Sequence, residues 1–297
     1  MTIRTDKKDN VKIGIIGKGF VGSAVAHGFS HQTSYGANIK IYDSNPERSQ
    51  NSLDETVNDS QFIFLSVPTP SDSKGNMDLS IVENALSSIN DVNKSDNNIV
   101  LLRSTVVPGT TEKFQQKFPK LRFVFNPEFL TERSAAFDFI NQTRVILGGK
   151  EKYTSKVKKL YQDRFGTFLP VIETNFQTAE LIKYMNNLFF ATKVSFLNEM
   201  RMLADQISVD WDKAIEGFVM DGRIGHSHLS VPGPDGKLGF GGSCFPKDIQ
   251  ALISFGDMND IEMNVLKGAW KTNLVVRPEK DWEKLKGRAV SNDKEER

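Results

Sequence analysis

The sequence predicts an α/β fold in which a doubly wound parallel sheet is followed by a long central helix and a small helical domain. Three observations predict it. Short apolar runs alternate with amphipathic segments in the first part of the chain, and a glycine-rich turn directly follows the first run. Farther on, residues 174–206 contain neither glycine nor proline, which favours one uninterrupted helix.

Six apolar runs predict buried strands, because each is short and bounded by polar or turn-forming residues. They cover residues 11–16, 39–43, 61–67, 99–103, 122–125 and 144–148. Between the third and the fourth, Leu79, Val82, Leu86 and Ile89 recur at helical spacing. Strands that alternate with amphipathic helices indicate βαβ units, so we expect a parallel sheet.

The composition argues against several classes of protein. The net charge of +1 leaves no electrostatic footprint for nucleic acid or an anionic membrane. No apolar stretch approaches the ~20 residues that span a bilayer, and the first ten residues lack the apolar core of a secretory signal. One cysteine cannot form an internal disulfide, and the histidine spacing suggests no metal site. We therefore expect a cytoplasmic globular protein.

The glycine-rich turn predicts a dinucleotide site of the Rossmann type. Gly17, Gly19 and Gly22 form G-x-G-x-x-G between the first strand and a helix, with Phe20 and Val21 inside the motif. Backbone N–H groups at such a helix start bind a pyrophosphate, and an acidic residue ~20 positions on binds the ribose hydroxyls.

Asp43 is the acidic residue at the end of the second strand. Its carboxylate would repel a 2′-phosphate, which favours NAD over NADP. Arg48 leaves an alternative open, because a nearby arginine can accommodate that phosphate or can be a solvated helix charge.

Two later strands end in hydroxyl-bearing loops, at the sheet edge where open α/β folds bind ligands. Pro68 and Thr69 follow the third strand, and Ser104 and Thr105 follow the fourth. Turn and cap chemistry explains either loop alone. Together, and beside a dinucleotide motif, the loops indicate cofactor contacts.

Two carboxylates leave the next strand in Asn126-Pro127-Glu128-Phe129-Leu130-Thr131-Glu132. One of Glu128 and Glu132 is expected to be a solvated or capping charge. The other is a candidate general base.

The long helix carries a polar stripe by the i, i+3, i+4 rule, formed by Glu180, Lys183, Asn187, Val194 and Asn198. Lys183 and Asn187 lie one turn apart, so both can serve one developing oxyanion. Such a stripe faces water in most helices. Here residues 188–191 are too apolar for the helix to be largely exposed, which favours a functional stripe.

The only cysteine, Cys244, lies in Gly241-Gly242-Ser243-Cys244-Phe245-Pro246-Lys247-Asp248. A buried, inert thiol is the ordinary expectation for a single cysteine. Its flanks are instead glycine, serine, proline and charge. Glycines allow close approach of a substrate, Lys247 favours the thiolate, and Asp248 is a candidate acid or base. We therefore expect a nucleophile.

In this order, these motifs resemble the nucleotide-sugar dehydrogenases, over about residues 11 to 250. The resemblance implies a two-step, NAD-dependent oxidation of the C6 hydroxyl of UDP-glucose to UDP-glucuronate. GDP-mannose and UDP-N-acetylhexosamines are alternative substrates, and a catalytically idle binding protein is a rival from another class.

The resemblance also implies roles for single residues. Asp248, a water and Thr105 take up the alcohol proton, and Cys244 forms a thiohemiacetal and then a thioester. Lys183 and Asn187 stabilise the oxyanion, and Glu128 activates the hydrolytic water. Glu132 and Lys247 lie on the nicotinamide side. The substrate-binding residues implied are Glu128, Phe129, Leu130, Glu132, Lys183, Asn187, Arg223, Phe240 and Gly241, within lining segments 129–132 and 235–241.

The implied organisation has three parts. Residues 1–170 form the NAD-binding Rossmann domain, 171–265 a central helical domain for catalysis and dimerisation, and 266–297 a short, partly disordered extension whose last eight residues are disordered. Arg223 would reach the substrate of the partner subunit in a homodimer built on the long helix. Family members usually continue into a second α/β domain that binds UDP, and residues 249–297 are too few to form one.

Overall fold

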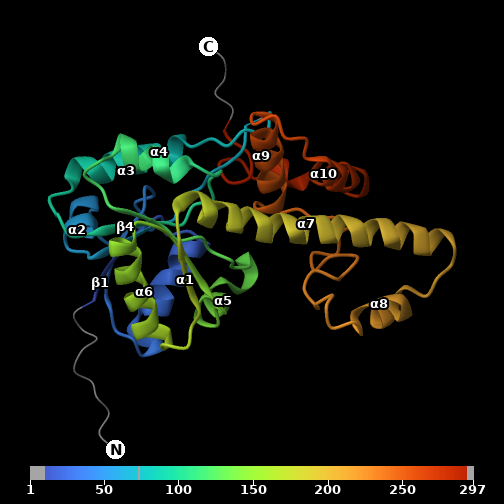
Figure 1. Ribbon diagram of the computed structural model, residues 1–297, viewed down its shortest axis with the longest axis horizontal. Coiled ribbons are helices and arrows are strands. Elements are labelled where there is room, and N and C mark those ends of the chain that lie inside the picture. Colours follow the sequence, from blue (N-terminus) through green and yellow to red (C-terminus); the bar gives the residue numbers. More distant parts are fainter. Residues whose placement is uncertain (1–10, 73, 293–297) are drawn as a thin grey trace, which may run out of the picture. The chain divides into compact units, whose positions relative to one another are not determined.

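The computed structural model describes residues 11–72 and 74–292, which form two compact units (Figure 1). The first unit comprises residues up to Thr69 together with Leu79–Lys183, and the second comprises Pro70–Asp78 and the residues from Tyr184 onward. The functional division at residues 170 and 265 stays a prediction. The expected absence of a signal in residues 1–10 lies outside the described residues.

A seven-stranded sheet forms the centre of the first unit, in the order β2-β1-β3-β4-β5-β6-β7. Its strands are β1 (Lys12–Ile16), β2 (Asn38–Tyr42), β3 (Phe62–Leu65), β4 (Ile99–Leu102), β5 (Phe123–Phe125), β6 (Val145–Gly149) and β7 (Val171–Thr174). Every neighbouring pair is parallel except β5 with β6. The predicted α/β class is confirmed, with a mostly parallel sheet.

Two features of this sheet differ from the prediction. β6 runs antiparallel to β5 because the connecting residues 126–144 return to the end of the sheet that they left, and their one α-helix, of six residues, is only ~9 Å long. β7 was missed because Val171–Thr174 is a short edge strand, half buried rather than a continuous apolar run.

Helices cover both faces of the sheet (Figure 1). α1 (Phe20–Phe29), α5 (Ala135–Ile140) and α6 (Glu151–Phe165) lie on one face, and α2 (Leu53–Asn58), α3 (Ser80–Val92) and α4 (Thr110–Lys117) on the other. The short 3-10 helices η1 (His31–Thr33) and η2 (Glu132–Ser134) complete the unit. The helical spacing predicted for residues 78–89 is confirmed as α3, with Val82, Leu86 and Ile89 buried.

An aromatic cluster fills the core beneath α1, α5 and α6. The ring of Phe29 lies 5.5–6.2 Å from those of Tyr35, Phe64, Phe139, Tyr161 and Phe165. Edge-on contacts of this kind add stability beyond the apolar area that they bury. Phe29 is the last residue of α1 and Phe64 lies in β3, so the cluster packs the end of this helix against the sheet.

The second unit is helical. It contains the part of α7 (Phe176–Gln206) from Tyr184 onward, then α8 (Trp211–Val219), α9 (Phe245–Asp257), α10 (Asn264–Val276) and the 3-10 helix η3 (Asp281–Lys284). α7 confirms the uninterrupted helix predicted for 174–206, apart from its first two residues. Among the described residues, none of the helices has the length and apolar character needed to cross a membrane.

Segment 70–78 belongs to the second unit although it joins β3 to α3 in the chain. Ser71 accepts from the Ser291 N–H through its carbonyl and donates its own N–H to the carbonyl of Ala289. The Ser254 hydroxyl hydrogen-bonds Asn76. Residues 290–292 of the predicted disordered end are therefore placed, and 293–297 lie outside the described residues.

Candidate active site

The glycine-rich turn uses its three glycines in three different ways. Gly17 has φ +91°, and a Cβ there would lie 2.5 Å from the carbonyl oxygen of Ser66. A Cβ at Gly22 would overlap the carbonyl oxygen of Gly17, whereas one at Gly19 would meet nothing within 4 Å. Gly17 thus permits the tight turn, Gly22 permits close packing of the helix, and Gly19 leaves the backbone open to a pyrophosphate.

The start of α1 suits an anion. Gly19 is its N-cap, no side chain caps it, and its first turn holds no acidic residue. Asp43 lies beside the turn, where its Oδ2 accepts from the Lys18 N–H at 2.6 Å and its Oδ1 from the Asn45 N–H at 2.8 Å. Arg48 is exposed in the turn that follows. The residues therefore fit a dinucleotide, although the two interpretations of Arg48 stay open.

The two hydroxyl-bearing loops are tied to each other. The Ser104 hydroxyl donates to the carbonyl of Val67 at 2.6 Å, and the Thr69 hydroxyl donates to the carbonyl of Thr105 at 2.8 Å. Two of the predicted cofactor residues therefore hold neighbouring strand ends in register. Their positions at the carboxyl edge of β3 and β4 are as predicted.

Glu128 and Lys183 form a buried ion pair in the first unit. The ammonium of Lys183 lies 2.9 Å from Glu128 Oε1 and donates to the Glu128 carbonyl at 2.6 Å. Burial raises the pKa of Glu128, but the charge of Lys183 and the N–H of Leu130 outweigh it. The pKa of Glu128 therefore lies below its ordinary value.

Arg103 is a functional candidate that sequence reasoning missed. It is buried at the end of β4, where its Nη1 donates to Asn126 Oδ1 at 2.7 Å. Tyr161 donates to the same oxygen at 2.6 Å, and burial raises the pKa of its hydroxyl. The charge of Arg103 also helps to lower the pKa of Glu128. The sequence carried one signal for it, a single arginine at the end of the otherwise apolar run 99–103.

The other carboxylate of this loop is placed differently. Glu132 is exposed at the start of η2, whereas Glu128 is buried. Between them, Phe129 lies under two cations, with Arg144 4.2 Å and Lys183 5.4 Å from its ring centre. Of the two carboxylates, Glu128 has the environment of a functional group.

Cys244 opens α9 in the second unit. It is the N-cap residue of that helix and is half buried, and its Sγ lies 3.8 Å from the Ser243 hydroxyl. The amide end of a helix favours a negative charge, and Cys244 stands at that end of α9.

One turn into α9, Asp248 joins Cys244 to the long helix. Its N–H donates to the carbonyl of Cys244 at 2.9 Å, and its side chain is fully buried. Asn187 of α7 donates to its Oδ2 at 2.7 Å, while Lys247 pairs with its Oδ1. The structure thus brings together four of the predicted residues, Asn187, Cys244, Lys247 and Asp248, within one unit.

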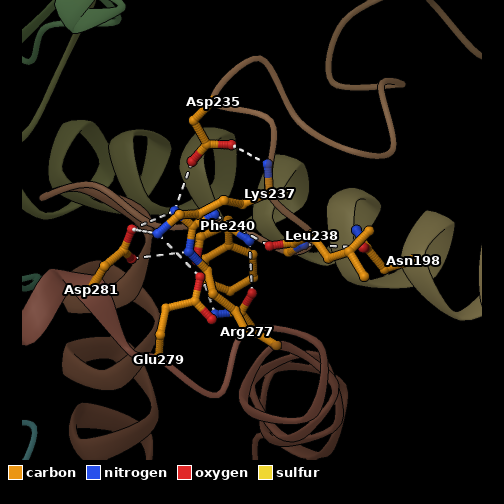
Figure 2. A network of polar contacts seen from close by, with 10 residues as sticks. Asn198, Asp235, Lys237, Leu238, Phe240, Arg277, Glu279 and Asp281 are labelled. Carbon is orange, nitrogen blue, oxygen red and sulfur yellow. Dashed lines mark hydrogen bonds and ion pairs between the residues drawn. The ribbon is translucent and has the colours of Figure 1, made fainter.

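Residues 235–241, the loop that precedes Cys244, are held by side chains from α10 and its C-cap (Figure 2). Asn273 exchanges two hydrogen bonds with the backbone of Phe240, and Arg277 reaches Asp235 and the Leu238 carbonyl. Sequence reasoning missed Asn273 and Arg277, whose signal was an i, i+4 polar pair at the end of α10, around the apolar residues 274–276. Phe240 is itself buried, so its side chain serves packing.

Arg223 lies apart from these groups. It is in the loop after α8, its side chain is 89% exposed, and it pairs with Asp221. The exposed position leaves it available to a second molecule.

Comparison with known proteins points to one family. Residues 47–164 match the NAD-binding domain of the UDP-glucose/GDP-mannose dehydrogenase family, and residues 177–274 match its central domain. UDP-glucose 6-dehydrogenase of Rickettsia bellii is 36% identical over 225 residues, covering 74% of this chain and 50% of that protein. The chain spans about half the length of several such curated relatives.

Solved structures agree. A UDP-glucose dehydrogenase from Pyrobaculum islandicum superposes with TM-score 0.77 at 29% identity, covering 93% of this chain and 70% of that one. The UDP-D-ManNAc dehydrogenase of Pyrococcus horikoshii gives TM-score 0.73 at 25% identity, covering 89% and 68%.

Proposed function

Because the chain belongs to the UDP-glucose/GDP-mannose dehydrogenase family, we propose that it oxidises the C6 hydroxyl of a nucleotide sugar with NAD as oxidant. Its substrate is UDP-glucose and its product UDP-glucuronate, as the names of its curated relatives suggest. GDP-mannose and a UDP-N-acetylhexosamine are the alternatives, and the Pyrococcus relative keeps the latter open.

One observation carries the proposal: Cys244 stands at the amide end of α9, one turn before a buried carboxylate that is paired with a lysine and an amide. A cysteine needed only for packing requires no such surroundings. A thiolate beside an acid or base is what covalent catalysis at an aldehyde requires.

The turn at Gly17, Gly19 and Gly22, with Asp43, would hold the NAD. Bound NAD supplies a hydride acceptor for each of the two oxidations. The protein's own residues then orient the sugar and move protons.

In the first oxidation, Asp248, a water and Thr105 take up the proton of the C6 hydroxyl. The thiolate of Cys244 adds to the resulting aldehyde carbon, and a C–S bond forms while the carbonyl oxygen becomes an alkoxide. Lys183 and Asn187, one turn apart on α7, stabilise that oxyanion.

The second oxidation leaves a thioester on Cys244. Glu128 removes a proton from a water that adds to the thioester carbon, and the C–S bond breaks to return the thiolate and release the carboxylate. The lowered pKa of Glu128 keeps it ionised at neutral pH, as a base must be.

We also propose that the protein is a homodimer joined along α7. Apolar side chains recur on one face of that helix and are 47–65% exposed at Met185, Phe189, Phe196, Leu203 and Ile207. A contiguous exposed apolar stripe of this kind marks a protein interface. A partner docked there is also what a role for Arg223 at the partner's substrate requires.

The test is to supply NAD with UDP-glucose, GDP-mannose and a UDP-N-acetylhexosamine in separate assays, and to count NADH per sugar consumed. Two NADH per UDP-glucose is the expected result. No NADH from any nucleotide sugar would sink the proposal and favour an idle binding protein. Cys244→Ser should stop before the carboxylate forms, with Ser88→Ala, on an exposed helix face, as the matched control.

A further inference from the structure

Arg277 donates four side-chain hydrogen bonds in the second unit (Figure 2). Its Nε donates to Asp281 Oδ1 at 2.9 Å, and its Nη2 lies 2.7 Å from both Asp281 Oδ2 and Asp235 Oδ2. Its Nη1 donates to the Leu238 carbonyl at 3.2 Å. One guanidinium thus joins the loop before Cys244 to the segment after α10.

This arrangement is buried and electrostatically matched. Arg277 is only 2% exposed, while Asp235 and Asp281 are partly exposed at its rim. Lys237 adds a second cation, 3.0 Å from Asp281 and 3.1 Å from Glu279. The planar fork of Arg277 holds Asp281 through two parallel hydrogen bonds while it also reaches Asp235 and a carbonyl, and the ammonium of a lysine lacks that rigid two-pronged geometry.

Amide side chains grip the same loop by its backbone. Asn273 Oδ1 accepts from the Phe240 N–H at 2.7 Å, and its Nδ2 donates to the Phe240 carbonyl at 3.0 Å. Asn198 of α7 accepts from the Gly239 N–H at 3.0 Å. The loop is therefore held at successive residues from two helices.

Two glycines of the loop are explained by this grip. Gly239 has φ +66°, and a Cβ there would overlap Asn273 Oδ1. A Cβ at Gly241 would lie 2.5 Å from Arg277 Nη2 and 2.6 Å from its Cζ. The guanidinium therefore lies flat against the backbone three residues before Cys244. At Gly242, by contrast, φ is +70° and a Cβ would meet nothing within 4 Å.

We propose that Arg277 is a positioning residue for Cys244. By fixing residues 235–241 it sets where the chain enters α9, and hence where the thiol stands. The expected effect of Arg277 on turnover rests on the proposed function, because it concerns the steps in which Cys244 reacts. Its structural consequence can be measured without turnover.

The sole cysteine of the chain makes the measurement direct, since alkylation by iodoacetamide reports on Cys244 alone. Two variants loosen the loop: Arg277→Met removes the whole guanidinium, and Asp235→Asn removes one loop-side carboxylate that is 43% exposed. Asp257→Asn makes the same chemical change in the ion pair with Lys267, on the far end of α9, and is the control.

We expect both loop variants to be alkylated about threefold faster, because a released loop exposes the half-buried thiol. We expect kcat with UDP-glucose to fall about tenfold, because misplacing a reacting group by a fraction of an ångström has that effect. The KM for NAD should not change, which a general loss of structure would not allow. Arg277→Lys should resemble Arg277→Met, because it restores the charge but not the fork.

Unchanged alkylation and unchanged kcat in Asp235→Asn would overturn the proposal, whether or not Arg277→Met folds. So would an equal effect in Asp257→Asn. If the wild-type protein makes no NADH from any nucleotide sugar, the proposed function fails, but the alkylation comparison still decides whether Arg277 positions the thiol.

Discussion

Lys183 and Asn187 each face a carboxylate in the structure, one with Glu128 and the other with Asp248. Their spacing on one helix made them visible in the sequence. Their partners were not visible, because these lie 55 and 61 residues away in the chain. Helical spacing therefore predicts which residues share one face of a helix. It does not predict which side chains from distant parts of the chain will pair with them.

The acid sensitivity of Asp281 gives a prediction for a single residue. Its hydrogen bonds with Arg277 lower the pKa of Asp281 from 3.8 to about 2. A carboxyl whose pKa is lower in the folded state stabilises the fold above its unfolded value and loses that effect as the pH falls through its folded value.

We therefore expect wild-type stability to fall between about pH 4 and pH 2 by about 2 kcal/mol more than that of Asp281→Asn. The measurement is urea unfolding at several pH values, followed by tryptophan fluorescence. Glu283→Gln, a carboxylate of the same segment, is the control. Parallel pH curves for wild type and Asp281→Asn would contradict the assignment.

Among the elements, the turn between β1 and α1 was predicted most completely. Its glycine spacing was visible in the sequence, and the structure adds which glycine serves which need. The different roles of these glycines can be tested by adding a single methyl group, as alanine, at Gly19 or at Gly22.

Gly19→Ala should fold with wild-type stability, because its Cβ meets open space and its φ of −78° suits alanine. It should weaken NAD binding about tenfold or more, since the methyl group occupies the approach to the backbone. Gly22→Ala should instead destabilise the fold by about 2 kcal/mol or more, because its Cβ overlaps the Gly17 carbonyl. Thermal unfolding and NAD titration separate the two, and equal effects on stability would count against these roles.

The long helix buries polar side chains beside apolar ones and exposes a further apolar stripe. The predicted polar stripe is buried: Glu180 accepts from Gly109 and Thr111 to cap α4, and Asn198 binds Gly239. Residues 188–191 were expected to be too apolar for the helix to be largely exposed; Leu188 and Ala191 are buried, whereas the side chain of Phe189 is 65% exposed. Sequence pattern alone could not distinguish a water-facing stripe from one that serves buried partners.

At the scale of the whole molecule, the apolar stripe of α7 gives a prediction about assembly. Wild-type protein should sediment at twice the 33.3 kDa chain mass. Phe189→Glu should give a monomer, because a charge in an apolar interface must be desolvated without a partner.

Val265→Glu is the matched control, since Val265 is 71% exposed on α10 and lies outside the stripe. A monomeric wild type, or a dimer that Phe189→Glu leaves intact, would contradict the proposed interface. Sedimentation velocity at several concentrations makes the comparison.

Most of the fold could be predicted from the sequence, because continuous apolar runs such as 99–103 and a helix free of glycine and proline are strong local signals. What escaped prediction was non-local. The reversal of β6 depends on where a connection re-enters the sheet, and β7 is too exposed at the edge to show an apolar run. Arg277 acts through partners on two other segments.

The placement of segment 70–78 has a consequence for exchanging parts between relatives. The second unit is discontinuous in the chain, since Ser71 and Asn76 bond residues beyond 250 while the residues on either side of the segment, Thr69 and Leu79, belong to the first unit. A chimaera joined once, between Lys183 and Tyr184, would inherit this segment from the wrong parent. Two more junctions, near residues 69 and 79, are needed for the helical unit to travel whole.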